Sequence, residues 1–301
     1  FNDKYSTFLN EGNVLIETLY KKTKNLSHYK EFNDNMLSYQ SKIHEMSVAI
    51  STLKNAHSKY TKCGQIGLLL KCNFDLFYNN EYNDTIMYLT YLNQYNKDIG
   101  QLSQYVQEKK INKCTFIKSQ KCTKLKDMYY INHFHDNYIE NNIHLDKNII
   151  ITGPNASGKT TLIKSIIINL FLSQSIGFGC YRKCKINMYD YFHSYLNIPD
   201  TSNRDSLFQA EARRCKNILD NIKDDNIRHF CVFDELFSGT NPYEAISSAV
   251  SFLRYLNKYK NVSFIITTHY LDICNKLSND KKTHNCNMKI NKKEDGEFLY
   301  T

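Results

Sequence analysis

The sequence predicts an α/β domain over residues 128–301, preceded by an all-α domain with long antiparallel helices over residues 1–127. From residue 148 onward, short apolar runs alternate with helical stretches, as an α/β sheet requires. Residues 1–127 contain no proline, and apolar side chains recur there at alternating spacings of three and four. That spacing is typical of long helices packed along a seam. Together these observations predict that the chain folds as two domains.

Two seams define the helices of the first domain. The first comprises Met36, Tyr39, Ile43, Met46, Ile50, Leu53, His57 and Tyr60, and the second comprises Tyr88, Leu92, Tyr95, Ile99, Leu102 and Val106. A looser segment, residues 61–83, joins them. We expect His57 to be a seam residue rather than a metal ligand, because no partner ligand accompanies it.

Composition excludes several classes of protein. The ten cysteines form no Cys-x-x-Cys pair, which argues against a zinc module. There is no secretory signal and no apolar run near the ~18 residues that a membrane span needs. We therefore expect an intracellular protein, in cytoplasm or nucleus, without a membrane partner. Because the chain begins at Phe1 and ends inside a strand-like run, we expect it to be part of a longer protein.

Positive charge is concentrated before the second domain. The formal net charge is +9, and residues 109–126 hold seven lysines without an acidic residue. Such a stretch is suited to DNA phosphates. A solvated, lysine-rich connector is the simpler interpretation of this stretch, and contact with DNA is the alternative.

A glycine-rich turn lies between a predicted strand and a predicted helix. The apolar run 148–152 leads into Gly153-Pro154-Asn155-Ala156-Ser157-Gly158-Lys159-Thr160-Thr161, and a helical segment, 162–172, follows. Such a loop turns backbone N–H groups onto phosphate oxygens at a helix N-terminus. Lys159 is expected to reach the β- and γ-phosphates, and the Thr160 hydroxyl to ligate Mg²⁺. The pattern predicts a P-loop that binds a nucleoside triphosphate, since a chance match in a turn would not supply the strand, the helix, the lysine and the threonine together.

Polar residues end two further predicted strands. Asp234 and Glu235 follow the apolar run 229–233, and His269 follows the run 262–267. We expect Asp234 to hold Mg²⁺ and Glu235 to polarise the attacking water, which makes hydrolysis the natural reaction. His269 is placed to sense the γ-phosphate or to position that water, although a buried structural histidine is the alternative.

The order of these motifs resembles that of the MutS family, the ATPases of DNA mismatch repair. Five segments carry the resemblance: 138–145, 153–161, 206–211 followed by 217–219, 234–245, and Thr268-His269-Tyr270. The resemblance implies an ABC-type ATPase that forms a head-to-tail dimer around ATP and Mg²⁺. Tyr138, beside Ile139, would stack on adenine, and Ser206 would face the γ-phosphate held by the other subunit. ATP would be held in cis by Gly153, Pro154, Asn155, Ala156, Ser157, Gly158, Lys159, Thr160 and Thr161.

The chain departs from the family pattern in three places. Ala156-Ser157 stands where the family commonly has Met-Gly, Arg204 stands where a glycine is common, and residues 238–242 read Ser-Gly-Thr-Asn-Pro. The mismatch-reading pattern Phe-x-Glu does not occur in residues 1–127. These departures indicate a divergent MutS-like branch. They leave the ATPase chemistry intact and weaken any transfer of mismatch recognition.

The sequence thus favours an ATP-gated homo- or heterodimer that acts on DNA in mismatch repair or recombination. A second hypothesis is a nucleotide-dependent assembly ATPase without a DNA role. A third is an ABC ATPase of the SMC or transporter type, although the Leu-Ser-Gly-Gly-Gln signature of those proteins is absent. An aromatic-plus-glutamate wedge in a preceding region would distinguish the first hypothesis from the second.

Overall fold

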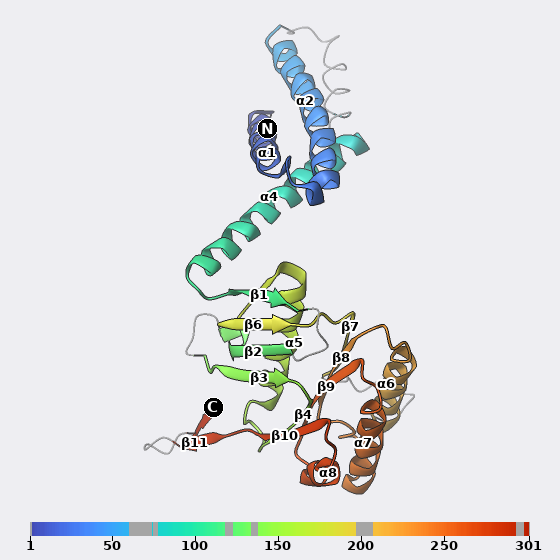
Figure 1. Ribbon diagram of the computed structural model, residues 1–301. Coiled ribbons are helices and arrows are strands. Elements are labelled where there is room, and N and C mark those ends of the chain that lie inside the picture. The colour runs from blue at the N-terminus through green and yellow to red at the C-terminus, as the bar shows by residue number, and fades with distance from the viewer. Residues whose placement is uncertain are drawn as a thin grey trace. The chain divides into compact units, whose positions relative to one another are not determined.

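The computed structural model describes residues 2–59, 74, 78–117, 123–133, 138–196, 207–292 and 298–300. The chain divides into two compact units, Phe1–Gln104 and Tyr105–Thr301. The described elements of the first unit are helices, and the second unit is α/β, as predicted (Figure 1).

The first unit is built on α1 (Asn2–Thr23), the short 3₁₀ helix η1 (Ser27–Tyr29), α2 (Lys30–Lys59) and α4, which begins in this unit (Asn80–Gln107). The seam residues Met36, Ile43, Met46 and Ile50 are buried, as their spacing predicted. They pack with Leu9 and Ile16 of α1, a helix that the seams did not reveal. Gly12 permits close packing there, because a Cβ at this position would lie 2.8 Å from the side chain of Leu89.

The second seam is buried only in its first part. Leu92 is buried, whereas Tyr95 is 51% exposed and Ile99 is 45% exposed. Among the described residues, the core of the first unit reaches along α4 only as far as Leu92. The prediction of a continuous packed seam over residues 88–106 was therefore wrong beyond Leu92, because no described core side chain covers Tyr95 or Ile99.

A five-stranded mixed sheet lies in the second unit, with the order β3-β2-β6-β1-β5. It comprises β1 (Asn112–Phe116), β2 (Thr123–Met128), β3 (Asn141–Leu145), β5 (Phe178–Gly179) and β6 (Lys183–Ile186). The boundary between the units thus precedes β1 and differs from the one expected after residue 127, because β1 and β2 pair with strands from later in the chain. Part of the lysine-rich stretch 109–126 is sheet rather than a connector.

The second sheet is parallel and has the order β10-β4-β9-β8-β7. Its strands are β4 (Asn148–Thr152), β7 (Tyr191–Tyr195), β8 (His229–Asp234), β9 (Val262–Thr268) and β10 (Thr283–Asn287). Strands β4, β8 and β9 confirm the three apolar runs read from the sequence. A parallel sheet buried on both faces needs such uninterrupted apolar runs.

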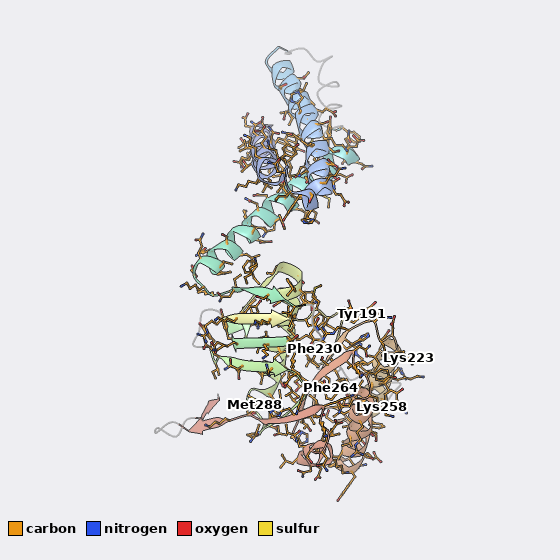
Figure 2. The ribbon with its side chains drawn as sticks, in the orientation of Figure 1. Tyr191, Lys223, Phe230, Lys258, Phe264 and Met288 are labelled. Carbon is orange, nitrogen blue, oxygen red and sulfur yellow. The ribbon has the colours of Figure 1, made fainter. Side chains whose placement is uncertain are left out.

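Alternating side chains of the parallel sheet enter two different cores. Ile150, Phe233 and Phe264 pack with α6 (Leu207–Asn221), α7 (Pro242–Leu256) and α8 (Leu271–Leu277). Ile149 and Phe230 face the other way, toward α5 (Lys159–Ile176) and the mixed sheet. In Figure 2, Phe230 and Phe264 lie inside the unit, whereas Lys223 and Lys258 lie at its periphery. The parallel sheet is therefore the rigid centre on which the site is built. A short hairpin, β11 (Ile290–Lys292) with β12 (Phe298–Tyr300), follows it.

Within the described residues, the cysteines that carry a burial assignment are free thiols, and no helix combines the length and the apolarity that a bilayer span requires. The same part of the chain holds no group of three or more His, Cys, Asp or Glu side chains arranged to bind a metal.

Candidate functional site

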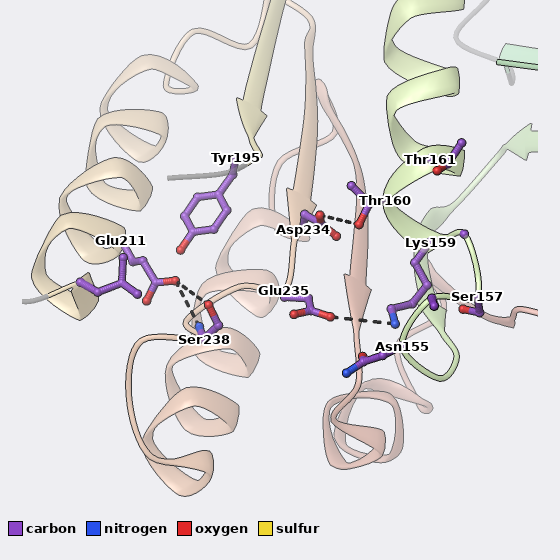
Figure 3. Close-up of a pocket in the computed structure, with 13 residues that line it drawn as sticks. Asn155, Ser157, Lys159, Thr160, Thr161, Tyr195, Glu211, Asp234, Glu235 and Ser238 are labelled. Atoms are coloured by element: carbon purple, nitrogen blue, oxygen red, sulfur yellow. Dashed lines mark hydrogen bonds and ion pairs between the residues drawn. The ribbon is translucent and has the colours of Figure 1, made fainter. Parts of the chain in front are cut away.

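A cavity of about 570 Å³ opens at the edge of the parallel sheet where the strands end. Strands β4, β8 and β9 deliver the loops that follow Thr152, Asp234 and Thr268 to this one edge. In an α/β fold this is the edge where ligands bind. The cavity is lined by residues 155–161 together with Tyr195, Leu207, Glu211, Asp234, Glu235 and Ser238 (Figure 3).

The loop between β4 and α5 has the backbone of a tight cradle. Ala156 and Gly158 both have positive φ, 61° and 87°, in the region that favours glycine. A Cβ at Gly153 would lie 2.8 Å from Met288 Cβ and 2.9 Å from Ser157 Oγ, so this position has no room for a side chain. The Ser157 hydroxyl is buried without a hydrogen-bond partner. A buried hydroxyl of that kind can donate to, or accept from, a polar group bound at the loop.

Lys159 begins α5 and lies almost wholly inside the site, at 5% exposure. Its ammonium group donates to the carbonyl oxygens of Gly153 (2.9 Å) and Pro154 (3.1 Å). The Glu235 carboxylate lies 3.9 Å away. The cation is thus held at the mouth of the loop by partners from the loop itself.

Asp234 is tied to the first turn of α5 and to the neighbouring strand β9. Its carboxylate accepts a hydrogen bond from the Thr160 hydroxyl (2.8 Å) and another from the Thr267 hydroxyl of β9. Thr160 and Asp234 are distant in the sequence, and the parallel sheet brings them together. Figure 3 shows this contact on the wall of the cavity, beside Lys159.

Glu235 turns back into the cavity because the chain bends sharply after β8. Its φ is +50°, and its N–H donates to the Thr267 carbonyl at 3.1 Å. One carboxylate oxygen lies 3.9 Å from Lys159 Nζ and 3.8 Å from His269 Nδ1. The three residues expected to be catalytic, Lys159, Glu235 and His269, therefore meet at one point.

Two residues named from the resemblance lie outside the lining of the cavity. Tyr138 is 42% exposed and stacks on Tyr129, with ring centroids 4.0 Å apart. Ile139 is 43% exposed, and neither residue lines the cavity. Ser206 lies outside the described residues.

The sequence comparison agrees with this geometry. The family model for MutS domain V matches residues 149–301, which is just over half of the chain and contains the whole cavity. The chain belongs to the MutS family. This confirms the resemblance, and four of the five segments that carried it lie within the matched residues, while 138–145 precedes them.

Curated MutS proteins are similar over about half of the chain. The DNA mismatch repair protein MutS of Porphyromonas gingivalis is 31% identical over 170 residues, which cover 54% of this chain and 19% of that protein. The MutS of Persephonella marina is 31% identical over 185 residues, 58% of this chain and 21% of that protein. The mismatch repair protein MSH3 of Lodderomyces elongisporus is 30% identical over 161 residues, 50% and 16% respectively. The chain thus spans about a fifth of the length of these relatives.

Four residues that line the cavity of this MutS-family chain were not expected there from the sequence, namely Tyr195, Leu207, Glu211 and Ser238. Glu211 is 2% exposed, and its carboxylate accepts hydrogen bonds from the Ser238 N–H (3.1 Å), the Ser238 hydroxyl (3.4 Å) and the Gly239 N–H (3.2 Å). Burial, and secondarily the nearby Glu211, raises the pKa of the Tyr195 hydroxyl, which points toward Glu211 in Figure 3. A Cβ at Gly239 would lie 2.6 Å from Leu207, so the loop packs directly on the start of α6.

A signal for Glu211 was present in the sequence. It lies four residues before Cys215 and seven before Ile218, both buried, so an acid occupies the apolar face of an amphipathic helix. A carboxylate on such a face needs polar partners. Those partners come from a loop 27 and 28 residues later, which the sequence alone did not place.

We expect Glu211→Ala to slow turnover by about tenfold or more while leaving nucleotide affinity almost unchanged. Glu211 holds the loop that follows Glu235, the residue expected to act as the base, and a small displacement of such a group has effects of that size. Losing a buried, charged acceptor should also lower the free energy of unfolding by about 2–3 kcal/mol. Separate measurements of kcat and KM, with chemical denaturation, test this. Glu211→Gln keeps one acceptor oxygen, so its turnover rate and its free energy of unfolding should lie between those of the wild type and Glu211→Ala. Equal loss of affinity and turnover would contradict a positioning role.

Proposed function

We propose that this chain is the ATP-binding and ATP-hydrolysing part of a MutS-family protein, with an ABC-type P-loop domain preceded by an all-α domain. The observation that carries the proposal is the contact between Thr160 and Asp234, which joins the end of the glycine-rich loop to the acidic end of β8 at 2.8 Å. Together with Lys159 and Glu235, these two residues bring a cation, a hydroxyl and two carboxylates to a single cavity. That set matches what phosphoryl transfer requires.

The residues present fit ATP and Mg²⁺. The buried, unpartnered Ser157 hydroxyl and the side-chain-free Gly153 leave polar space for phosphate oxygens. Thr160 and Asp234 offer the hard oxygen ligands that Mg²⁺ prefers. An ion with few protein ligands, completed by phosphate and water, suits a site that has no larger cluster of ligating side chains among the described residues. When bound, Mg²⁺ would neutralise charge on the transferred phosphoryl group.

In the proposed reaction, Lys159 leaves its loop carbonyls and binds the phosphates, and Glu235 orients a water molecule and accepts its proton. His269, 3.8 Å from Glu235, holds that carboxylate and signals whether the γ-phosphate is present. The loop N–H groups at the start of α5 bind phosphate through their fixed dipoles. Tyr138 and Ile139 remain proposed base contacts, and we infer that a base would meet Tyr138 on the ring face opposite Tyr129.

We further propose that ATP joins two copies, or this chain and a related one, with Ser206 completing the site of the partner subunit. Ser206→Ala should leave ATP binding by the monomer unchanged and weaken ATP-dependent dimerisation by about tenfold, the worth of one charge-assisted hydrogen bond. Sedimentation velocity on the Glu235→Gln background measures this directly. Ser202→Ala, in the same stretch, is the matched control. An unchanged dimerisation constant for Ser206→Ala would remove Ser206 from the trans site.

DNA is the proposed partner, as the names of the relatives, DNA mismatch repair proteins, suggest. The test of the proposed function is the ATPase rate of the purified chain, with and without Mg²⁺ and with duplex, mismatched or branched DNA. We expect Mg²⁺-dependent hydrolysis that one form of DNA stimulates. Hydrolysis that is indifferent to DNA, with no DNA binding at low salt, would support the assembly ATPase instead. No hydrolysis under any condition would overturn the proposal.

A further inference from the structure

A second hollow, of about 1010 Å³, lies at the opposite edge of the parallel sheet, where its strands begin. We call it the basic groove and define it by its seven cationic residues: Lys124, Lys147, Lys185, Arg228, Lys260, Lys281 and Lys282. They come from six separate segments of the second unit. Only Asp146 and Asp225 in its lining carry negative charge.

Two of these cations already have structural roles. Lys282 Nζ donates to the Asn257 carbonyl at 2.5 Å, and Arg228 Nη1 donates to the Met188 carbonyl at 3.0 Å. The side chains of the five others, Lys124, Lys147, Lys185, Lys260 and Lys281, are exposed and have no ion pair or hydrogen bond among the described residues. Asp146 lies near His144 instead, at 3.5 Å. Most of the positive charge of the groove is therefore free to bind a ligand.

The strand register makes this charge costly for the fold. Lys124 lies directly opposite Lys185 across the antiparallel pair β2–β6. A second pair in the same two strands, Lys126 opposite Lys183, lies outside the lining of the groove. Like charges that face each other across strands destabilise a sheet. A fold that places two such pairs side by side is better explained by a polyanionic ligand than by solvation alone, because neither pair is relieved by a described carboxylate.

We propose that the basic groove binds the sugar–phosphate backbone of a DNA duplex. Three features favour this ligand. The free charges are lysines, which act as point charges suited to phosphate. The surface is hollow, so it can receive a ridge of phosphates, whereas a bilayer is flat. Among the described residues, none of the exposed large apolar side chains lines the groove, and membrane-surface binding commonly uses such side chains.

The groove is well separated from the ATP site. Strand β9 runs from one edge to the other over seven residues, which places the two edges roughly 20 Å apart. This distance exceeds the screening length of ~8 Å at physiological salt. Charge changes in the groove should therefore leave DNA-free ATP hydrolysis unaffected. The inference rests on the DNA role in the proposed function and assigns that role a surface on the ATPase domain.

The test is the salt dependence of binding to a fluorescein-labelled duplex, measured by anisotropy on the whole chain. Lys185→Glu with Lys260→Glu should weaken binding about tenfold or more at low salt and reduce the slope of log K against log salt by about 2. The matched control is Lys216→Glu with Lys276→Glu, two exposed lysines of α6 and α8 outside the groove. The affinity of this control for the duplex should fall by no more than about threefold, and its slope of log K against log salt should equal that of the wild type. Lys185→Gln with Lys260→Gln should show the same reduction in slope without reversing the charge.

Equal losses of duplex affinity in the groove and control variants would show that the basic groove is not the DNA-binding surface, and would place DNA binding elsewhere on the chain. Loss of binding to anionic phosphatidylserine vesicles, with DNA binding unchanged, would overturn it in favour of a lipid ligand. A wild-type chain that binds no duplex would overturn both the groove and the proposed DNA role. The DNA-free ATPase rate of each variant, expected to equal that of the wild type, shows that the variant is folded, and the wild-type rate tests the ATP site separately.

Discussion

Glu235→Gln is expected to reduce the ATPase rate by about 100-fold or more while ATP binding persists, because a positioned general base contributes about 10²–10⁴-fold. Glutamine has nearly the same shape, so the sharp turn at φ +50° and the N–H bond to Thr267 are kept. What disappears is the negative charge and the ability to take a proton from water. The amide also no longer pairs with Lys159, 3.9 Å away, so that lysine is freer to bind phosphate.

The measurement is single-turnover hydrolysis together with equilibrium binding of ATP to the same variant. We expect a bound ATP that persists, and a population of dimers that accumulates with it. Glu244→Gln is the matched control, since Glu244 is an exposed carboxylate nine residues further on, in the first turn of α7. It should hydrolyse ATP at nearly the wild-type rate. A wild-type rate in Glu235→Gln would remove Glu235 from the role of base.

The parts of the site that the sequence predicted are those encoded locally. Residues 153–161 follow a strand and begin a helix, so their pattern, glycine spacing and helix N-terminus can be read in one window. The apolar runs ending at Asp234 and before His269 are equally local, and parallel strands must end at one edge of their sheet. The convergence of Lys159, Glu235 and His269 follows from these two facts.

Long-range pairing accounts for what the sequence did not predict. The strand Thr123–Met128 reads as a lysine-rich connector because its buried residues, Thr123, Leu125 and Met128, are separated by charges and break strict alternation after Leu125. It is a strand because β3 and β6 pair with it from later in the chain. The prediction of a buried seam along α4 was wrong beyond Leu92 for a related reason. The spacing shows that Tyr95 and Ile99 share a helix face with Leu92, but it does not show where the helices that cover this face end.

Removal of the Lys159 side chain is expected to have the largest effect on binding. Lys159→Ala should weaken ATP binding by about 100-fold or more, ~3 kcal/mol, because a nearly buried ammonium group bound to phosphate makes charge-assisted hydrogen bonds in a partly desolvated site. The Lys159 side chain is only 5% exposed. No other described cation lines the cavity and could replace it. The carbonyls of Gly153 and Pro154 would also lose their donor, which loosens the loop.

ATP titration calorimetry and the ATP-induced rise in melting temperature both test this. The rise should vanish in Lys159→Ala, while the melting temperature without ATP changes by a few degrees at most, since the loop lies at the edge of the sheet. Lys164→Ala, on the same helix and outside the cavity, should retain the full rise. ATP binding at wild-type affinity by Lys159→Ala would show that the loop residues 153–161 do not hold the triphosphate, and would overturn the ATP site itself. Loss of ATP binding in Lys159→Ala, together with retained binding in Glu235→Gln, would separate the two roles. Lys159 would then be the residue that binds the phosphates, and Glu235 the base that activates the attacking water.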